Sequence, residues 1–216
     1  MKFKVHFMKK EEEYIRDLTE IRSMMERSTK FVSLAGWSGV LVGLYALAGT
    51  YIAYRLIPSD AKAINDLTDN NPAFSDIVLN LSALAIVVLL LAIGTAMFLS
   101  YRKAMQNGEK LWTPTSRRLL INMAIPLGTG GLFVIILLFK GLVGLIVPSM
   151  LIFYGLTLIN ASKFTFEEMK SLGIIEILLG LAAAWYMSYG LLFWGIGFGI
   201  VHVIYGIYLH QRYEKK

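Results

Sequence analysis

Residues 171–209 decide the fold, and they read SLGIIEILLGLAAAWYMSYGLLFWGIGFGIVHVIYGIYL. Two apolar runs flank a very short turn near Ser188–Leu191, which predicts a hairpin of two transmembrane helices. Glu176 lies 14 residues before Gly190, and His202 lies 12 residues after it. Because a helix rises about 1.5 Å per residue, an antiparallel pair places these two ionisable side chains at nearly one depth.

The composition of the whole chain agrees with a membrane protein. Its 216 residues are 56% hydrophobic, and the mean hydropathy is +0.59. Several apolar runs reach about 18 residues, enough to cross a hydrocarbon core of about 30 Å. The chain has no cysteine, which excludes disulfides and thiolate metal sites. The Lys and Arg residues that give the net charge of +6 are expected to flank membrane helices rather than to bind nucleic acid.

The apolar runs predict an all-α, polytopic membrane protein with six transmembrane helices, at about 31–56, 77–101, 119–139, 142–161, 171–188 and 191–209. These spans form one bundle over residues 31–209, and residues 210–216 form a cytosolic tail. With these boundaries 18 of the 21 Lys and Arg residues lie on one side, and Arg55, Lys62 and Lys140 lie on the other. The positive-inside rule therefore predicts a multi-pass protein of the cell inner (plasma) membrane with both termini in the cytosol.

Residues 1–30 form the cytosolic segment before the first span. Tyr14, Leu18, Ile21 and Met25 follow the alternating four- and three-residue spacing of a heptad pattern, which predicts an amphipathic helix over Lys9–Lys30. Two alternatives stay open for its apolar stripe. It lies on lipid headgroups or the protein's own cytosolic loops, or it binds a protein partner or a second copy of the chain.

Small residues recur at four-residue spacing in the first span, at Ala35, Gly39 and Gly43. Such a series lets helix backbones approach closely in lipid. We expect it to pack against another helix of the same chain, and a homodimer seam is the rival interpretation.

The third span contains one proline and three glycines within six residues: Pro126, Gly128, Gly130 and Gly131. Proline removes a backbone hydrogen bond, and each glycine costs about 1 kcal/mol relative to alanine. The segment predicts either a kink or a broken helix whose free backbone groups meet a ligand, as in transporters.

A basic loop follows the second span and is expected to contact anionic lipid headgroups. Its cationic residues are Arg102, Lys103, Lys110, Arg117 and Arg118.

Glu176 and His202 are the candidate functional residues. Each shares a helical face with a stripe of small residues, and we expect the two stripes to pack together; they are Gly173, Gly180 and Ala183 in one span and Gly195, Gly199 and Gly206 in the other. The hypothesis is that Glu176 and His202 meet in a cytosol-facing pocket, which Asn122 and Asn160 join. The alternative is structural: a snorkelling or protonated glutamate, and a histidine used in packing.

Residues Arg22–Tyr54, RSMMERSTKFVSLAGWSGVLVGLYALAGTYIAY, resemble an uncharacterised family of bacterial six-helix inner-membrane proteins. The shared pattern is a charged helix, then Ser-Thr-Lys-Phe, then a first span rich in Ser, Gly and Ala. The resemblance implies the same topology and no particular activity.

Three functions are compatible with these features. The first is a non-enzymatic regulatory or partner-binding membrane protein that acts through residues 9–30. The second is a small proton-coupled transporter or channel that uses Glu176 and His202. The third is a lipid-modifying membrane enzyme. No catalytic residue, metal ligand set or cofactor is predicted, because the chain has no HExxH, GxSxG or P-loop motif.

Overall fold

The computed structural model describes residues 36–57, 72–106 and 112–213, together with Tyr14 and Gly108. The regular elements in this part of the chain are all helices: α2 (Gly36–Leu56), α3 (Pro72–Gln106), α4 (Pro114–Phe139), η3 (Val143–Leu145), α5 (Ile146–Ala161), α6 (Glu168–Trp185), η4 (Met187–Tyr189), α7 (Gly190–Trp194), η5 (Gly195–Val201) and α8 (His202–Tyr213). Of these, η3 and η4 are 3-10 helices and η5 is a π-helix. The predicted helix over Lys9–Lys30 and the residue Ala35 lie outside the described residues, except for Tyr14.

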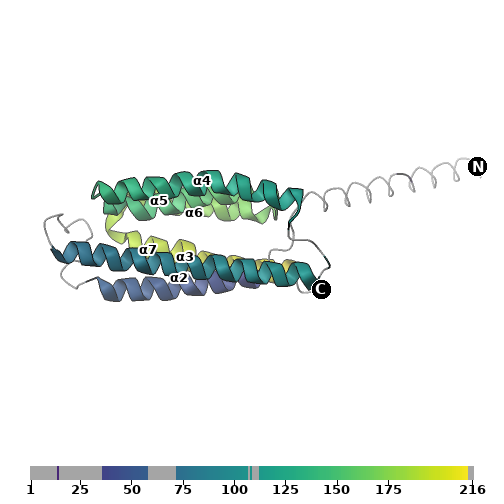
Figure 1. Cartoon of the computed structure of the whole chain (residues 1–216), viewed down its shortest axis with the longest axis horizontal. Coiled ribbons are helices and arrows are strands. Elements are labelled where there is room, and N and C mark those ends of the chain that lie inside the picture. Colours follow the sequence, from purple (N-terminus) through teal and green to yellow (C-terminus); the bar gives the residue numbers. More distant parts are fainter. Residues whose placement is uncertain (1–13, 15–35, 58–71, 107, 109–111, 214–216) are drawn as a thin grey trace, which may run out of the picture.

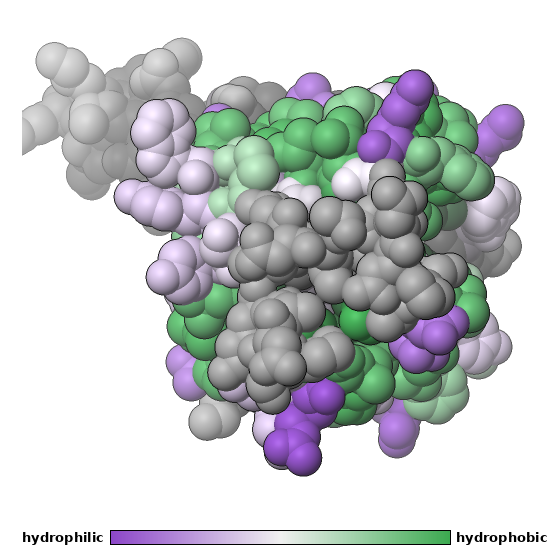
Figure 2. All heavy atoms as spheres, turned by 90° about the vertical axis from the view of Figure 1, so that its left-hand side faces the viewer, coloured by the Kyte–Doolittle hydropathy of each residue, from purple (hydrophilic) through white to green (hydrophobic). Residues whose placement is uncertain are grey.

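Five helical segments among the described residues are long and apolar enough to cross a membrane: Gly36–Leu56, Asp76–Gln106, Pro114–Phe139, Val143–Ala161 and Met187–Tyr213. The most apolar window of α3 buries none of its residues inside the protein. Figure 2 shows hydrophobic side chains over much of the molecule, seen from one end. A soluble protein rarely exposes so large an apolar surface. These helices therefore indicate a membrane-embedded protein.

The helix α6 differs from these five segments in its charge. It has 18 residues and includes Glu168, Lys170 and Glu176. Its length suits a span of the membrane, but its charged residues set it apart from the apolar candidates. The prediction of six spans is thus supported directly by five helices.

The helices form two layers (Figure 1). One layer contains α4, α5 and α6, with α5 packed against both neighbours. The other contains α2 and α3 together with α7, η5 and α8, which form the last long helical segment. The chain passes between the layers twice, from α3 to α4 and again at η4. The layers meet where α7 and η5 pack against α6 and where α7 packs against α5.

A seam of glycines joins α2 to α8. A Cβ atom added at Gly206 would lie 2.9 Å from both Gly36 O and Gly39 C. At Gly43 it would lie 2.7 Å from Gly199 O. Only glycine permits so close an approach of two backbones. Gly39 and Gly43 therefore pack within the chain, as the first of the two interpretations predicted.

The glycine stripe of α6 packs against α5, not against the last helix. A Cβ at Gly173 would lie 2.5 Å from Gly155 O, and one at Gly180 would lie 2.7 Å from a side-chain carbon of Ile152. The prediction that the stripes of residues 171–188 and 191–209 pack together is therefore wrong. Each stripe instead meets a different helix that offers its own glycines: α5 at Gly155 and α2 at Gly36, Gly39 and Gly43.

Of the two alternatives for the third span, a kink or a broken helix, the broken helix is wrong, because α4 continues through Pro126, Gly128, Gly130 and Gly131. In lipid an unpaired backbone group costs several kcal/mol, which outweighs the cost of glycine in a helix. Gly130 has a packing role, since a Cβ there would lie 2.5 Å from Phe153 Cβ. Gly128 and Gly131 have no such neighbour within 4 Å among the described residues.

Several helices extend beyond their predicted ends. The helix α3 covers 72–106 instead of 77–101, and α8 continues to Tyr213, into the predicted tail. The helix α4 begins at Pro114 because Thr113 caps it: Thr113 Oγ1 accepts the backbone N–H of Ser116 at 3.1 Å. Apolar length alone predicts the lipid-embedded portion, while caps and polar turns extend a helix further.

Candidate functional site

Glu176 and His202 lie side by side in the seam between the two layers. Their exposed fractions are 0% and 5%, and His202 Nδ1 lies 3.5 Å from Glu176 Oε1. Glu176 lies in the middle of α6, and His202 is the first residue of α8. The equal depth expected from the hairpin is therefore present, although the two helices belong to different layers.

Two hydrogen bonds orient the imidazole of His202. Its Nδ1 lies 2.9 Å from Gly197 O, and its Nε2 lies 2.8 Å from the hydroxyl of Tyr154. A carbonyl oxygen can only accept, so Nδ1 carries a hydrogen and donates it. In a neutral imidazole Nε2 is then the acceptor, and Tyr154 donates to it. Phe198 covers the same ring, with centroids 6.0 Å apart.

The carboxyl group of Glu176 has no such partner. Neither oxygen makes a hydrogen bond to another described residue. Gly197 leaves the space that the group occupies, because a Cβ there would lie 2.6 Å from Glu176 Oε2. A charged carboxylate without compensation is costly in such surroundings. The neighbouring imidazole is the group that could compensate it.

The pair can therefore hold one proton in two net-neutral arrangements. The proton lies on Glu176 beside a neutral imidazole, or it lies on His202 beside a carboxylate. Because Nδ1 already carries the hydrogen donated to Gly197 O, transfer across the 3.5 Å separation of Nδ1 and Oε1 also requires the imidazole to change tautomer. The arrangement is thus chemically suited to passing a proton within the membrane.

A π-helical segment precedes His202 directly. It is η5, seven residues from Gly195 to Val201, and it contains Gly197. A π-helix widens the helical turn and is frequent at functional sites. Here it places the Gly197 carbonyl against His202 and the bare Cα of Gly197 against Glu176.

The two asparagines predicted to join the cluster do not bond to it. Asn122 Nδ2 donates to Arg118 O of its own helix at 2.8 Å. Asn160 lies partly buried in α5, and among the described residues it makes no hydrogen bond to Glu176 or His202. The hydrogen-bond partners of His202 are Tyr154 and Gly197 instead of the two asparagines.

The remaining predicted binding residues lie at helix ends. Arg102, Arg117 and Arg118 are exposed and Lys103 is half-buried, while Lys110 lies outside the described residues. Their contact with anionic lipid headgroups stays a prediction. The part of the chain that the structure describes contains no group of three His, Asp or Glu side chains placed to hold a metal ion.

No protein-family model, curated protein or solved structure matches the chain. The resemblance at Arg22–Tyr54 therefore stays a prediction. The buried cluster of Glu176, His202, Tyr154 and Gly197 is thus the feature that bears on function.

Proposed function

We propose that the protein crosses the cell inner membrane six times, with both termini in the cytosol. The helix α6, fifth in chain order, completes the six spans, and its 18 residues lie alongside α5. Glu168 and Lys170 lie in its first turn, at the proposed membrane interface. Glu176 is then the one acidic or basic residue of α6 within the lipid-embedded part. An even number of spans agrees with 18 Lys and Arg on the side of both termini and three on the other.

We infer that the protein is a small proton-coupled transporter in which Glu176 and His202 carry the proton. The observation that supports this function is a fully buried carboxyl group with two unpaired oxygens beside an imidazole, at the seam between two helix layers. An unpaired buried acid lowers stability, so packing alone does not account for it. Ionisable groups in membrane helices commonly belong to ion or proton pathways.

The architecture supports the same proposal. The chain joins the two layers between α3 and α4 and again at η4. Relative movement of two helix bundles about a central site is a common way to expose that site to alternate sides of a membrane. The Glu176–His202 pair lies where such movement would separate or join the two groups.

The test is proton flux in liposomes that contain the purified full-length protein and a trapped pH-sensitive dye. A low-molecular-weight cell extract on one side supplies the unidentified substrate. We expect extract-dependent proton flux that Glu176→Gln abolishes and Asn122→Ala retains, since Asn122 bonds within its own helix. Absence of extract-dependent flux, or equal flux in Glu176→Gln, would overturn the proposal.

A second candidate function is regulation through a partner bound by residues 9–30. Within that segment Tyr14 is described, and it is helical and 60% exposed. An exposed tyrosine on a heptad stripe suits a protein contact. Deletion of residues 9–30 should then abolish copurification of a partner while proton flux is unchanged. A lipid-modifying activity has no comparable observation in its favour.

A further inference from the structure

The two layers are tied together at the end where α8 terminates. Glu168, at the start of α6, contacts two side chains of α8 through Oε1. It forms an ion pair with Arg212 Nη1 and accepts a hydrogen bond from the hydroxyl of Tyr213, each at 2.9 Å. The hydroxyl of Tyr205 also donates to the backbone oxygen of Glu168. Side chains of α8 thus hold the first turn of α6 at several points.

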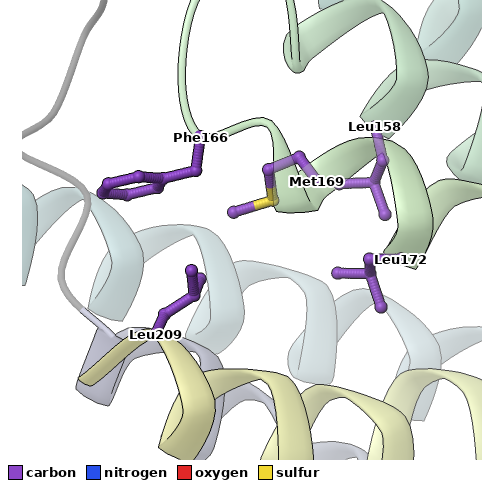
Figure 3. Close-up of a cluster of buried hydrophobic side chains, with 5 residues drawn as sticks. All are labelled: Leu158, Phe166, Met169, Leu172 and Leu209. Atoms are coloured by element: carbon purple, nitrogen blue, oxygen red, sulfur yellow. The ribbon is translucent and has the colours of Figure 1, made fainter. Parts of the chain in front are cut away.

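An apolar cluster lies near the start of α6 and the end of α8 (Figure 3). Leu209 comes from α8, and the other members come from α5, α6 and the loop between them: Leu158, Phe166, Met169 and Leu172. All five are buried. The ring of Phe166 also packs on Tyr213, with centroids 4.5 Å apart. The cluster therefore adds apolar contacts between α8 and the start of α6 at this end of the seam.

The contacts lie between the buried pair and the interface. Glu168 precedes Glu176 by eight residues, and Arg212 follows His202 by ten, which corresponds to about 12–15 Å along the helices. At the opposite end the chain itself joins the layers at η4. At the α8 end the chain also joins α3 to α4, but noncovalent contacts alone hold α6 to α8 there, so these two helices separate most easily at this end.

We propose that Glu168, Arg212 and Tyr213 form a latch that closes the Glu176–His202 site toward the side on which α8 ends. This inference rests on the proposed transport function, because it describes access to the same site. The latch is suited to opening, since Arg212 is 54% exposed and a solvent-screened ion pair is weak. Glu168 Oε2 also has no partner among the described residues.

The chain's lack of cysteine allows the latch to be tested by labelling a single introduced thiol. Leu172→Cys places a thiol in the apolar cluster, and Thr157→Cys places one at a residue with 0% exposure. Each is treated with a membrane-impermeant maleimide in vesicles whose exterior faces the α8 end. Labelling in SDS gives the total amount of reactive protein.

We expect Arg212→Gln to raise the labelling rate about three- to tenfold, as expected for loss of a screened ion pair and one hydrogen bond. Lys170→Gln, at an exposed position of the same helix, should leave the rate unchanged. Exchange of the charges in Glu168→Arg with Arg212→Glu should restore slow labelling. If Arg212→Gln fails to fold, Tyr213→Phe removes one hydrogen bond and should give a smaller increase.

The outcomes separate the latch from the transport function. Unchanged labelling in the latch variants, together with Glu176-dependent flux, overturns the latch alone. Faster labelling without any extract-dependent flux supports the latch and overturns the transport proposal.

Discussion

The glycine seam between α2 and α8 makes a quantitative prediction about stability. Gly206→Ala should destabilise the protein, whereas Gly131→Ala should not, although both changes add one methyl group to a helix. The difference is in their surroundings. A Cβ at Gly206 would contact backbone atoms of α2, while one at Gly131 has no neighbour within 4 Å among the described residues.

The magnitude follows from the distances. The added Cβ would approach Val40 N most closely and would lie 2.9 Å from Gly36 O and Gly39 C, whereas ordinary contact begins at 3.4 Å. Because all three neighbours are backbone atoms, the helices must separate by at least about 0.5 Å, which forfeits a quarter or more of each affected dispersion contact. Overpacking of this kind costs about 1–3 kcal/mol. Gly131→Ala instead gains up to about 1 kcal/mol of helix preference.

The assay is reversible unfolding in mixed micelles, followed by circular dichroism and tryptophan fluorescence. The two variants should differ by about 2–3 kcal/mol in unfolding free energy. The gain at Gly131 will be smaller if the helices persist in the unfolded state, as expected for helices that stay in a micelle. Equal unfolding midpoints for the two variants would refute the close approach of α2 and α8.

Three further predictions concern the buried residues. Glu176→Leu should preserve or raise the unfolding free energy, by up to about 2 kcal/mol, because it removes an unpaired buried acid; a large loss of thermal stability in detergent would count against this. Gly197→Ala should reduce proton flux at least about tenfold, because its Cβ would lie 2.6 Å from Glu176 Oε2 and a methyl group displaces the carboxyl by overpacking; wild-type flux in liposomes would contradict it. Phe166→Ala should cost about 3 kcal/mol and speed hydrogen exchange at the start of α6, whereas unchanged exchange would show that the apolar cluster does not hold that turn.

The helices and their approximate positions could be predicted from the sequence because hydrocarbon imposes a minimum apolar length. The depth of Glu176 and His202 was predictable for a similar reason, since two legs of a hairpin share one rise per residue. The ends of the helices were harder to predict from the sequence. Thr113 and Ser116 cap α4 through reciprocal local hydrogen bonds, which a count of apolar residues does not detect.

The partners of each helix could not be predicted from periodicity. A glycine stripe indicates that a helix packs closely, but it does not identify the neighbour, and here α6 meets α5 while α8 meets α2. The π-helix adds a second difficulty, because its wider turn changes the faces of residues on either side of it. Gly197 was therefore missed, and Tyr154 offered no signal beyond a hydroxyl within an apolar run.

The order of the helices along the chain has a consequence for biogenesis. The layer of α4, α5 and α6 is contiguous in sequence, but α2 and α3 obtain their third helix from the carboxyl end. During synthesis the first hairpin must wait in the bilayer until translation is complete, with its glycine face toward lipid. Ribosome stalling or premature termination before residue 195 would leave that face bare, a feature that membrane quality-control proteases could recognise.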